Sequence, residues 1–514
     1  MTITRRLLLL GSSALATLAS LPRLALAQGT QTAKLTFVLV NDIYQMNEDT
    51  GPDGKKRGGF PRLATIVKAE RAKAAQSGSR VIFAHAGDTL SPSLMSGIDR
   101  GYHIVSLLNM IPPDIFVPGN HEFDFGKEVF LQRMKEAKFP LFAANMRDAK
   151  DAALPGFKDR TIFDAGGIKI GLTGAALTET PAVSSPGDIT FSPLVASMQE
   201  QCKALRSEGA DFVVTVVHAP RDQDMALFQS RAADLILTGH DHDLFIEYDG
   251  RTAIVESAHD GLLVTVIDLT IVLDTREGRR ISWFANIRPI DTANIEPDPE
   301  VLAAVRGFEN ELSKEFDVAI AKTDVTLDSR TATMRTGEAA LGNLYADAIR
   351  ATTDSDIAIM NGGGLRGGKV YPPGSEITRR DVLLELPFRN HVAVLAITGK
   401  DLRAALENGI GMLPRNAGRF PQVSGMRFEA DLSRPPGSRV LSVHVGSAPL
   451  DEAKIYRLAT NDFMARGNDG YTMFRDLKQL VSDVDGPLIS NDVMVYLRKL
   501  GTVKTGVEGR IVFK

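Results

Sequence analysis

Short apolar runs rich in β-branched residues alternate with helical stretches from residue 34 to about residue 288. The runs fall at 35–40, 81–84, 115–118, 168–173, 212–217 and 235–238, and the longest helical stretches between them are 62–76, 127–137 and 193–208. Such alternation is typical of an α/β sheet flanked by helices. The first half of the chain is therefore predicted to form an α/β domain.

The pattern changes near Pro289, where two prolines precede a long amphipathic segment. Apolar residues recur every three or four positions there, at Val301, Val305, Phe308, Leu312 and Phe316, which predicts a connector helix. A second α/β segment follows, with helices at 338–351 and 400–408 and strands at 357–360 and 457–460. For a chain of 514 residues we therefore expect domains at 33–290 and 321–514, joined by a linker at 291–320.

Residues 1–27 are predicted to be a signal peptide. Arg5 and Arg6 precede an apolar stretch, and the segment ends in Ala25-Leu26-Ala27, the small-x-small pattern of a cleavage site. The paired arginines also resemble a twin-arginine export signal. A membrane anchor is the weaker interpretation, because Pro22 and Arg23 interrupt the apolar run before it reaches the ~20 residues that span a bilayer. We expect a periplasmic or secreted protein without stable membrane insertion.

Charge and cysteine content exclude several classes of function. The net charge is −4 and no basic run occurs, whereas binding of long DNA or RNA depends on clustered Lys and Arg. A single cysteine, Cys202, excludes an intramolecular disulfide and any multi-cysteine metal centre. A small-molecule partner is expected, and the sequence leaves the oligomeric state open.

Polar residues stand directly after five of the predicted strands. They offer carboxylate, amide and imidazole donors with almost no Lys or Arg between them: Asp42, Asp88, Asn120, His218, His240 and His242. In open α/β sheets, ligand-binding residues gather at the carboxyl ends of the strands. This mixed donor set suits divalent metals, and one carboxylate such as Asp88 is able to bridge two ions ~3.5 to 4 Å apart, the spacing used in phosphoryl transfer.

The same positions lie in five ordered blocks that resemble those of the calcineurin-like metallophosphoesterases: Asp42, Gly87-Asp88, Gly119-Asn120-His121-Glu122, His218 and Gly239-His240-Asp241-His242. The resemblance implies a four-layer α/β/β/α domain. It assigns one metal to Asp42, Asp88 and His242 and a second to Asp88, Asn120, His218 and His240. It also assigns a catalytic dyad to His121 and Asp124, in which the aspartate orients the imidazole ring. Mn, Zn or Co are the expected metals.

The first block departs from the family, which usually has Asp-x-His where this chain has Asp42-Ile43-Tyr44. A phenol with an ordinary pKa of about 10 binds as phenolate only beside a strong Lewis acid such as ferric iron. Three roles stay open for Tyr44: a ligand of such a metal, a hydrogen-bond partner of a water at the metal, and a structural replacement that weakens the first site. We favour the second and third over direct ligation.

Motifs in the second half resemble the carboxyl-terminal domain of the 5'-nucleotidases, the family that contains the periplasmic UDP-sugar hydrolases and the ecto-5'-nucleotidases. The motifs are Asn361-Gly362-Gly363-Gly364-Leu365-Arg366, Pro387-Phe388-Arg389-Asn390, Gln422-Val423-Ser424-Gly425, Asn461-Asp462-Phe463 and Gly467-Asn468-Asp469-Gly470-Tyr471. With both halves matched, the resemblance extends from about Lys34 to the end of the chain. It implies an α/β substrate-binding domain.

The resemblance assigns substrate contacts residue by residue. Phe388 and Phe463 match a pair of rings that clamp the base, and Asp469 matches the acid that accepts from ribose hydroxyls. Asn361 and Asn390 match polar contacts to the nucleoside or its surroundings. Arg335 and Arg366 match phosphate-contacting arginines, and Arg330 aligns less well, one residue off the usual spacing. Guanidinium groups suit phosphate because two parallel N–H groups meet two oxygens.

Two further departures lie beside the expected clamp. Arg389 and Asn468 occupy positions that are commonly glycine in the family. Arg389 adds bulk and charge, which would favour a second phosphate or narrow the pocket against large sugar nucleotides. Base and phosphate specificity therefore stay open.

Together these features predict an exported, dinuclear-metal 5'-nucleotidase that converts nucleoside 5'-monophosphates to nucleoside and phosphate. Two alternatives remain. The same scaffold also suits a 2',3'-cyclic nucleotide phosphodiesterase or a nucleotide-sugar or dinucleotide diphosphatase. The second alternative is a nucleotide-binding protein whose catalysis is impaired through Tyr44.

Overall fold

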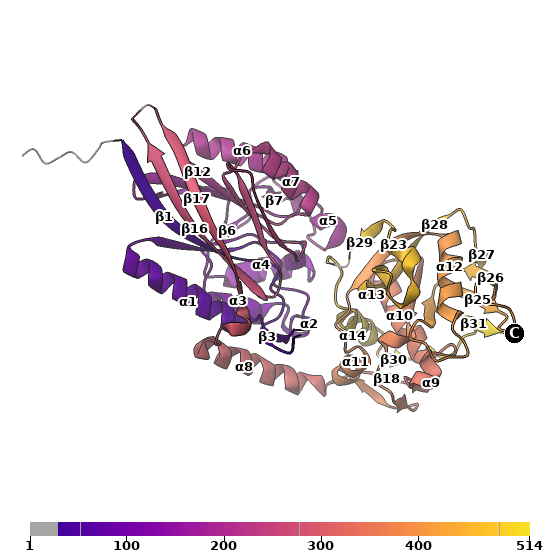
Figure 1. The fold of residues 1–514 in the computed structure, drawn as a ribbon. Helices are drawn as coiled ribbons and strands as arrows, with labels where there is room; N and C mark the ends of the chain where they lie inside the picture. Colours follow the sequence, from indigo (N-terminus) through magenta and orange to yellow (C-terminus); the bar gives the residue numbers. More distant parts are fainter. Residues whose placement is uncertain (1–28, 52, 277, 483) are drawn as a thin grey trace, which may run out of the picture.

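The computed structural model describes residues 29–514 except 52, 277 and 483. The predicted signal peptide at 1–27 lies outside these residues. Two lobes follow one another along the chain, linked by the long helix α8 (Pro299–Phe316) (Figure 1). Within the described range, no helix is both long and apolar enough to cross a membrane.

Two sheets form the centre of the N-terminal lobe. The first has the order β17 (Arg280–Asp291), β16 (Leu263–Asp274), β1 (Thr30–Val40), β4 (Arg80–His85), β5 (Ile115–Phe116), β6 (Leu141–Phe142) and β8 (Phe157–Lys158). The second has the order β14 (Leu244–Tyr248), β15 (Ala253–Ser257), β13 (Leu235–Thr238), β12 (Phe212–Val217), β10 (Ile168–Ala175) and β9 (Arg160–Ala165). Two small hairpin-like pairs lie outside them, β2 (Asp49–Thr50) with β3 (Lys56–Arg57) and β7 (Met146–Arg147) with β11 (Thr190–Phe191).

Helices cover the outer face of each sheet. The helices of this lobe are α1 (Phe60–Ser77), α2 (Ser96–Asp99), α3 (Tyr102–Met110), α4 (Lys127–Glu136), α5 (Thr180–Val183), α6 (Leu194–Ser207) and α7 (Arg221–Ser230). A buried apolar core with residues of both sheets, such as Phe37 and Val214, fills the space between them. A second core joins α1, α3, α4 and α8 to the first sheet, and a third joins α6 and α7 to the second. This is the predicted four-layer α/β/β/α arrangement.

Strand directions place the loops that carry the site. β1, β4 and β5 are parallel neighbours in the first sheet, and β10, β12, β13 and β15 are parallel neighbours in the second. Their carboxyl ends therefore open toward the same part of the lobe. The long antiparallel pair β16 and β17, which the sequence analysis did not identify, extends the first sheet beside β1.

A helix is present where the connector was predicted, namely α8. Asp298 caps it by accepting a hydrogen bond from the Val301 backbone N–H, and Pro299 stands at its first position, where no backbone donor is needed. Its buried residues, Val301 and Val305, belong to the core of the N-terminal lobe. The helix is thus anchored to the first lobe at its beginning.

The C-terminal lobe is built on a five-stranded sheet with two apolar cores. Its order is β24 (Pro421–Ser424), β20 (Ile357–Asn361), β28 (Ile455–Asn461), β23 (Val392–Thr398) and β29 (Gln479–Val481). Smaller sheets contain β27 (Ala448–Pro449), β26 (Val440–Val445), β25 (Met426–Ala430) and β31 (Ile511–Phe513); β22 (Glu376–Thr378), β18 (Ala319–Thr323) and β30 (Thr502–Val503); and β19 (Leu327–Asp328) with β21 (Val370–Tyr371). The helices are α9 (Thr331–Met334), α10 (Ala340–Thr352), α11 (Arg379–Glu385), α12 (Gly399–Ile410), α13 (Asp462–Ala465) and α14 (Ile489–Leu500).

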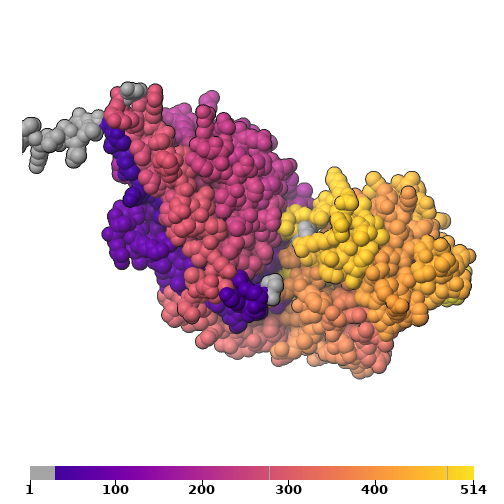
Figure 2. All heavy atoms as spheres, in the orientation of Figure 1, coloured from indigo at the N-terminus to yellow at the C-terminus, as the bar shows by residue number. Residues whose placement is uncertain are grey.

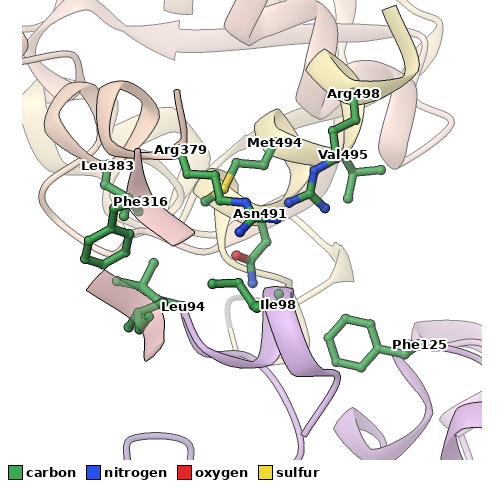
Figure 3. Close-up of a pocket in the computed structure, with 12 residues that line it drawn as sticks. Leu94, Ile98, Phe125, Phe316, Arg379, Leu383, Asn491, Met494, Val495 and Arg498 are labelled. Carbon is green, nitrogen blue, oxygen red and sulfur yellow. The ribbon is translucent and has the colours of Figure 1, made fainter. Parts of the chain in front are cut away.

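The lobes meet at α2, the end of α8, α11 and α14. An apolar pocket lies between these helices, and Leu94, Ile98 and Phe125 of the first lobe approach Leu383 and Met494 of the second across it (Figure 3). The Asn491 side chain donates a 3.1 Å hydrogen bond to the Ser93 carbonyl. In Figure 2 the yellow, late part of the chain lies against the N-terminal lobe.

Candidate active site

The predicted metal ligands come together where the strands end. Asp42 follows β1, Asp88 follows β4, and Asn120 follows β5, while His218 follows β12 and His240 follows β13. Ligand atoms of Asp88, His218 and His240 all lie within 4.8 Å of one another, and all three side chains are buried. The two sheets therefore deliver donors to one cluster.

Buried polar atoms in this cluster have no hydrogen-bond partner. Both side-chain atoms of Asn120, Oδ1 and Nδ2, lack one, as does Nδ1 of His240. The Nδ1 atom of His218 lies 2.8 Å from the Ala86 carbonyl, so Nδ1–H donates there and Nε2 faces Asp88 at 3.0 Å. Orphaned buried donors and acceptors are costly unless something binds them. The mixed oxygen and nitrogen donors present here fit divalent metals.

The backbone at these positions is strained in the same way. Asp42, Asp88, His240 and His242 all adopt positive φ angles of 53°, 55°, 104° and 64°. Such conformations disfavour residues with a Cβ and cluster at functional sites. A Cβ on Gly119 would overlap with the Oδ1 atom of Asp88, so only glycine lets this loop approach the carboxylate.

Two residues that the sequence analysis left without a role hold the loops in place. The Glu122 carboxylate accepts from the backbone N–H groups of Asp88, Thr89, Leu90 and Gly119 at 2.6–3.1 Å. The Asn41 amide donates to Asp42 Oδ2 at 2.7 Å and accepts from the Ser257 N–H. Glu122 lies in the Gly-Asn-His-Glu block, and its place in that block was the available signal.

Tyr44 lies inside the cluster. Its hydroxyl is 3.0 Å from Asp42 Oδ1 and 2.9 Å from His242 Nε2. Burial, together with the carboxylates of Asp42 and Asp88, raises the pKa of this phenol well above its ordinary value. Burial alone would raise the pKa of Asp42, but the charge and hydrogen bond of His242 hold it well below its usual range. A neutral phenol thus stands beside an ionised carboxylate.

The His121 ring is held between two acceptors. Nδ1 is 2.7 Å from Asp124 Oδ2, and the other Asp124 oxygen accepts from the Ser184 hydroxyl at 2.9 Å. Nε2 is 2.7 Å from the Val484 carbonyl of the C-terminal lobe. Because both partners accept, both ring nitrogens donate and the imidazole is protonated. Burial opposes that charge, but Asp124 and Asp88 raise the pKa of His121 well above its ordinary value.

Asp241, in the same block as His240 and His242, belongs to a separate acidic group. Ligand atoms of Asp224, Asp241 and Glu256 lie within 4.8 Å of one another. Arg221 forms ion pairs with all three, at 3.5 Å to Asp224, 3.5 Å to Asp241 and 2.5 Å to Glu256. A guanidinium already serves as the counter-charge there.

The predicted nucleoside contacts gather on the C-terminal lobe. Asn361 ends β20, and its Nδ2 donates to Asp469 Oδ2 at 2.8 Å while its Oδ1 accepts from Asn461 at 2.9 Å. Arg335 lies close to Arg366 and Asp469. Burial and the charge of Arg366 lower the pKa of Arg335. These residues form one polar surface with both signs of charge.

The two predicted clamp rings are exposed. Phe388 is 52% exposed and Phe463, in α13, is 40% exposed, so both rings are open to a ligand. The Arg366 guanidinium carbon lies 5.1 Å from the centre of the Phe388 ring. Asn390 donates to Asp462 Oδ1 at 2.6 Å, next to Phe463. The rings thus stand on the same surface as the charged contacts.

Three residues beside the predicted substrate contacts are engaged by other parts of the protein. Arg330 is ion-paired with Asp328 at 2.7 Å and exposed. Arg389 adopts φ 51°, a region that glycine adopts without strain, and its guanidinium lies 3.6 Å from Asp49 of the other lobe. Asn468 donates to the Phe463 carbonyl at 3.0 Å.

The predicted substrate contacts of the C-terminal lobe are not bonded to the metal-ligand cluster in the described part of this structure. Over the described residues, no hydrogen bond or ion pair links Arg335 or Arg366 to the metal-ligand cluster. The C-terminal contacts to that cluster come from Val484, at His121, and Asp485, whose Oδ1 is 3.9 Å from His240 Nε2. Neither residue was singled out from the sequence.

Comparison with known proteins identifies both halves. Residues 35–244 match the family model "Calcineurin-like phosphoesterase", and residues 319–476 match "5'-nucleotidase, C-terminal domain". The chain is 29% identical to a 5'-nucleotidase of Diplobatis ommata over 98% of this chain and 93% of that protein.

Solved structures with the same architecture also match. A 5'-nucleotidase precursor from Thermus thermophilus is 28% identical, with a TM-score of 0.54 over 93% of this chain and 99% of that one. The NAD nucleotidase NadN of Haemophilus influenzae is 20% identical, with a TM-score of 0.79 over 94% and 99%. The second likeness shows the fold alone.

Proposed function

We propose that this chain, whose two halves match the calcineurin-like phosphoesterase and the 5'-nucleotidase C-terminal family models, is a metal-dependent phosphoric ester hydrolase of the 5'-nucleotidase family that hydrolyses nucleoside 5'-monophosphates to nucleoside and phosphate. The observation that carries the proposal is the cluster of Asp88, His218 and His240 beside Asn120, whose side-chain atoms have no partner. His121 lies next to it, and exposed aromatic rings stand on the other lobe.

We propose that the cluster holds two divalent ions. Asp42, Asp88 and His242 would hold one, and Asp88, Asn120, His218 and His240 the other, with Asp88 shared. Bound there, the ions supply Lewis-acid stabilisation of phosphoryl oxygens and a water nucleophile at neutral pH. Asn41 and Glu122 would keep the ligand loops in position, as the hydrogen bonds of these residues indicate.

His121 would stabilise charge on the phosphoryl group. Asp124 and Ser184 fix its ring, and the protonated Nε2–H faces outward to an acceptor. A phosphoryl or leaving oxygen is an acceptor of the same kind and would replace the Val484 carbonyl. Such a positioned donor contributes about 10²- to 10⁴-fold to the rate.

The C-terminal lobe would bind the rest of the substrate. Phe388 and Phe463 would stack on the base, a contact worth ~1 to 3 kcal/mol per base and tolerant of base identity. Asp469, oriented by Asn361, would accept from ribose hydroxyls, and Arg335 and Arg366 would bind phosphate. Arg330 is the weakest member of this set because Asp328 holds it.

Tyr44 would act as a neutral phenol that hydrogen-bonds within the first metal site. Its raised pKa and its contact with Asp42 support this role over direct ligation as phenolate. His242 supplies the imidazole of this site from another loop. Mn, Zn or Co are the expected ions, and ferric iron would be required for phenolate ligation.

Substrate must reach both lobes, so we also propose a rotation of the C-terminal lobe about the end of α8, which brings the clamp to the metal cluster. An engineered disulfide across the lobes should stop turnover, and reduction of that disulfide should restore it.

We also propose export of the protein, on the basis of residues 1–27. The domain limits at 33–290, 291–320 and 321–514 are retained as proposals.

Phosphate release from AMP, cyclic AMP isomers, UDP-glucose and NAD, with Mn, Zn, Co or Fe added, tests the proposal. We expect AMP to be the best substrate and Tyr44→His to keep activity. Preference for UDP-glucose, NAD or a cyclic nucleotide would point to the diphosphatase or phosphodiesterase alternatives. Tight AMP binding without turnover under every metal would point to an impaired binding protein.

A further inference from the structure

The turn after β29 carries a carboxylate into the metal-ligand cluster from the other lobe. Asp485 is 8% exposed, and its Oδ1 is buried without a hydrogen-bond partner, 3.9 Å from His240 Nε2. The preceding residue, Val484, places its carbonyl 2.7 Å from His121 Nε2. The C-terminal lobe thus contacts a predicted metal ligand and the predicted catalytic histidine at the same time.

The geometry of this turn is fixed by its own lobe. The Ser482 hydroxyl donates to Asp485 Oδ2 at 2.6 Å and accepts from the Asp485 N–H at 3.2 Å. The Val392 N–H donates to the Pro487 carbonyl at the start of β23. A Cβ on Gly486 would overlap with the Val392 carbonyl oxygen, so only glycine fits there. One Asp485 oxygen is therefore satisfied internally, and the other is left facing the N-terminal lobe.

A buried carboxylate oxygen without a donor is unfavourable unless a cation or a donor reaches it. The group it faces is His240, which belongs with His218 and Asp88 to the cluster that fits a divalent ion. Carboxylate oxygen is an accepted ligand for Mn²⁺ and Zn²⁺. The position of Asp485 therefore has the chemistry of a ligand supplied across the lobe interface.

We propose that Asp485 binds the metal site in trans in the substrate-free protein and that the phosphate of the substrate displaces it. In the same state the Val484 carbonyl accepts the hydrogen bond of His121 Nε2–H. Both the Asp485 contact and the Val484 contact must therefore be released before a phosphoryl group binds. Metal loading then holds the lobes together, and substrate frees them to rotate. This inference rests on the proposed metal site.

The first test is Mn²⁺ binding to the full-length protein by titration calorimetry. Asp485→Asn keeps the size and the Ser482 contact but removes the charge, and we expect about tenfold weaker Mn²⁺ binding, at the lower end of the 10- to 100-fold losses seen around metal sites. Saturating inorganic phosphate should abolish the difference. Asp476→Asn, an exposed carboxylate of the same lobe, is the matched control and should bind as wild type does.

The second test measures the distance between the lobes by electron paramagnetic resonance. Spin labels at Glu200→Cys in α6 and Ala404→Cys in α12 report it, since both positions are exposed and Cys202 is buried. The probe is Zn²⁺, which is diamagnetic. In the wild type Zn²⁺ should narrow the distance distribution and phosphate should broaden it, whereas Asp485→Asn should not respond to Zn²⁺.

Wild-type Mn²⁺ affinity in both Asp485→Asn and Asp485→Ala would overturn the proposal. If Asp485→Asn bound Mn²⁺ more weakly but its inter-lobe distances still responded to Zn²⁺ as those of the wild type do, the proposed link between the lobes would be overturned. Equal thermal unfolding of the variants shows that neither result reflects misfolding. Failure of the proposed function would be seen separately, as Mn²⁺ binding and lobe closure without AMP hydrolysis by the wild type.

Discussion

The metal-ligand cluster and the nucleoside surface differ in how completely they are formed without ligand. The cluster is buried, strained and held by Glu122 and Asn41, so its geometry exists before anything binds. The clamp rings Phe388 and Phe463 are exposed, so they are not packed in the absence of a ligand. We infer that chemistry is built into the N-terminal lobe, whereas affinity for the nucleoside arises only when substrate bridges the lobes.

The largest expected effect concerns His121. His121→Ala should lower kcat for AMP by about 10²- to 10⁴-fold with a small change in KM, because it removes a donor needed in the transition state. Steady-state phosphate release measures this, with His444→Ala in the C-terminal lobe as control. If kcat were unchanged, the proposed role of His121 would be wrong.

Metal removal should lower the unfolding temperature of the N-terminal lobe more than that of the C-terminal lobe. A ligand at 1,000 times its Kd stabilises the fold by about 4 kcal/mol, so EDTA should lower the Tm of the N-terminal lobe by about 10 °C. Differential scanning calorimetry should show a second transition that moves much less. Equal shifts of both transitions would contradict the placement of most of the metal ligands in the N-terminal lobe.

Loss of a clamp ring should affect binding more than chemistry. Phe463→Ala should raise KM for AMP about 5- to 150-fold, the equivalent of ~1 to 3 kcal/mol of stacking. Ribose 5-phosphate lacks the base, so its kinetics should be the same in wild type and variant. A similar loss with both substrates would show that Phe463 supports the lobe rather than the base.

The smallest effect is expected for Arg330→Ala, which should change KM less than twofold because Asp328 already pairs the guanidinium. Arg366→Ala, by comparison, should raise KM at least tenfold through the loss of a charge-assisted phosphate contact. Both are measured with AMP. The reverse order would show that Arg330 leaves Asp328 when substrate binds.

Much of the N-terminal lobe was predictable because its signals are local. The strands 212–217 and 235–238 were predicted with the bounds of β12 and β13, and the residues that follow them converge because neighbouring parallel strands end together. The hairpin of β16 and β17 was not identified, since nothing local distinguishes a long edge hairpin from two separate strands.

Contacts between distant segments were beyond the sequence. Asp485 has no motif that marks it, and its proximity to His240 follows from how the lobes pack. The placement of Arg330 depends on a local ion pair with Asp328 that competes with a substrate role. Glu122 was visible within its block, but its four backbone contacts depend on loop conformations that spacing does not specify.

Anomalous diffraction from crystals grown with Mn²⁺ tests the metal site most directly. We predict two peaks that share Asp88, one beside Asp42 and His242 and the other beside Asn120, His218 and His240. No peak at these residues, or a peak only at Asp224, Asp241 and Glu256, would contradict it.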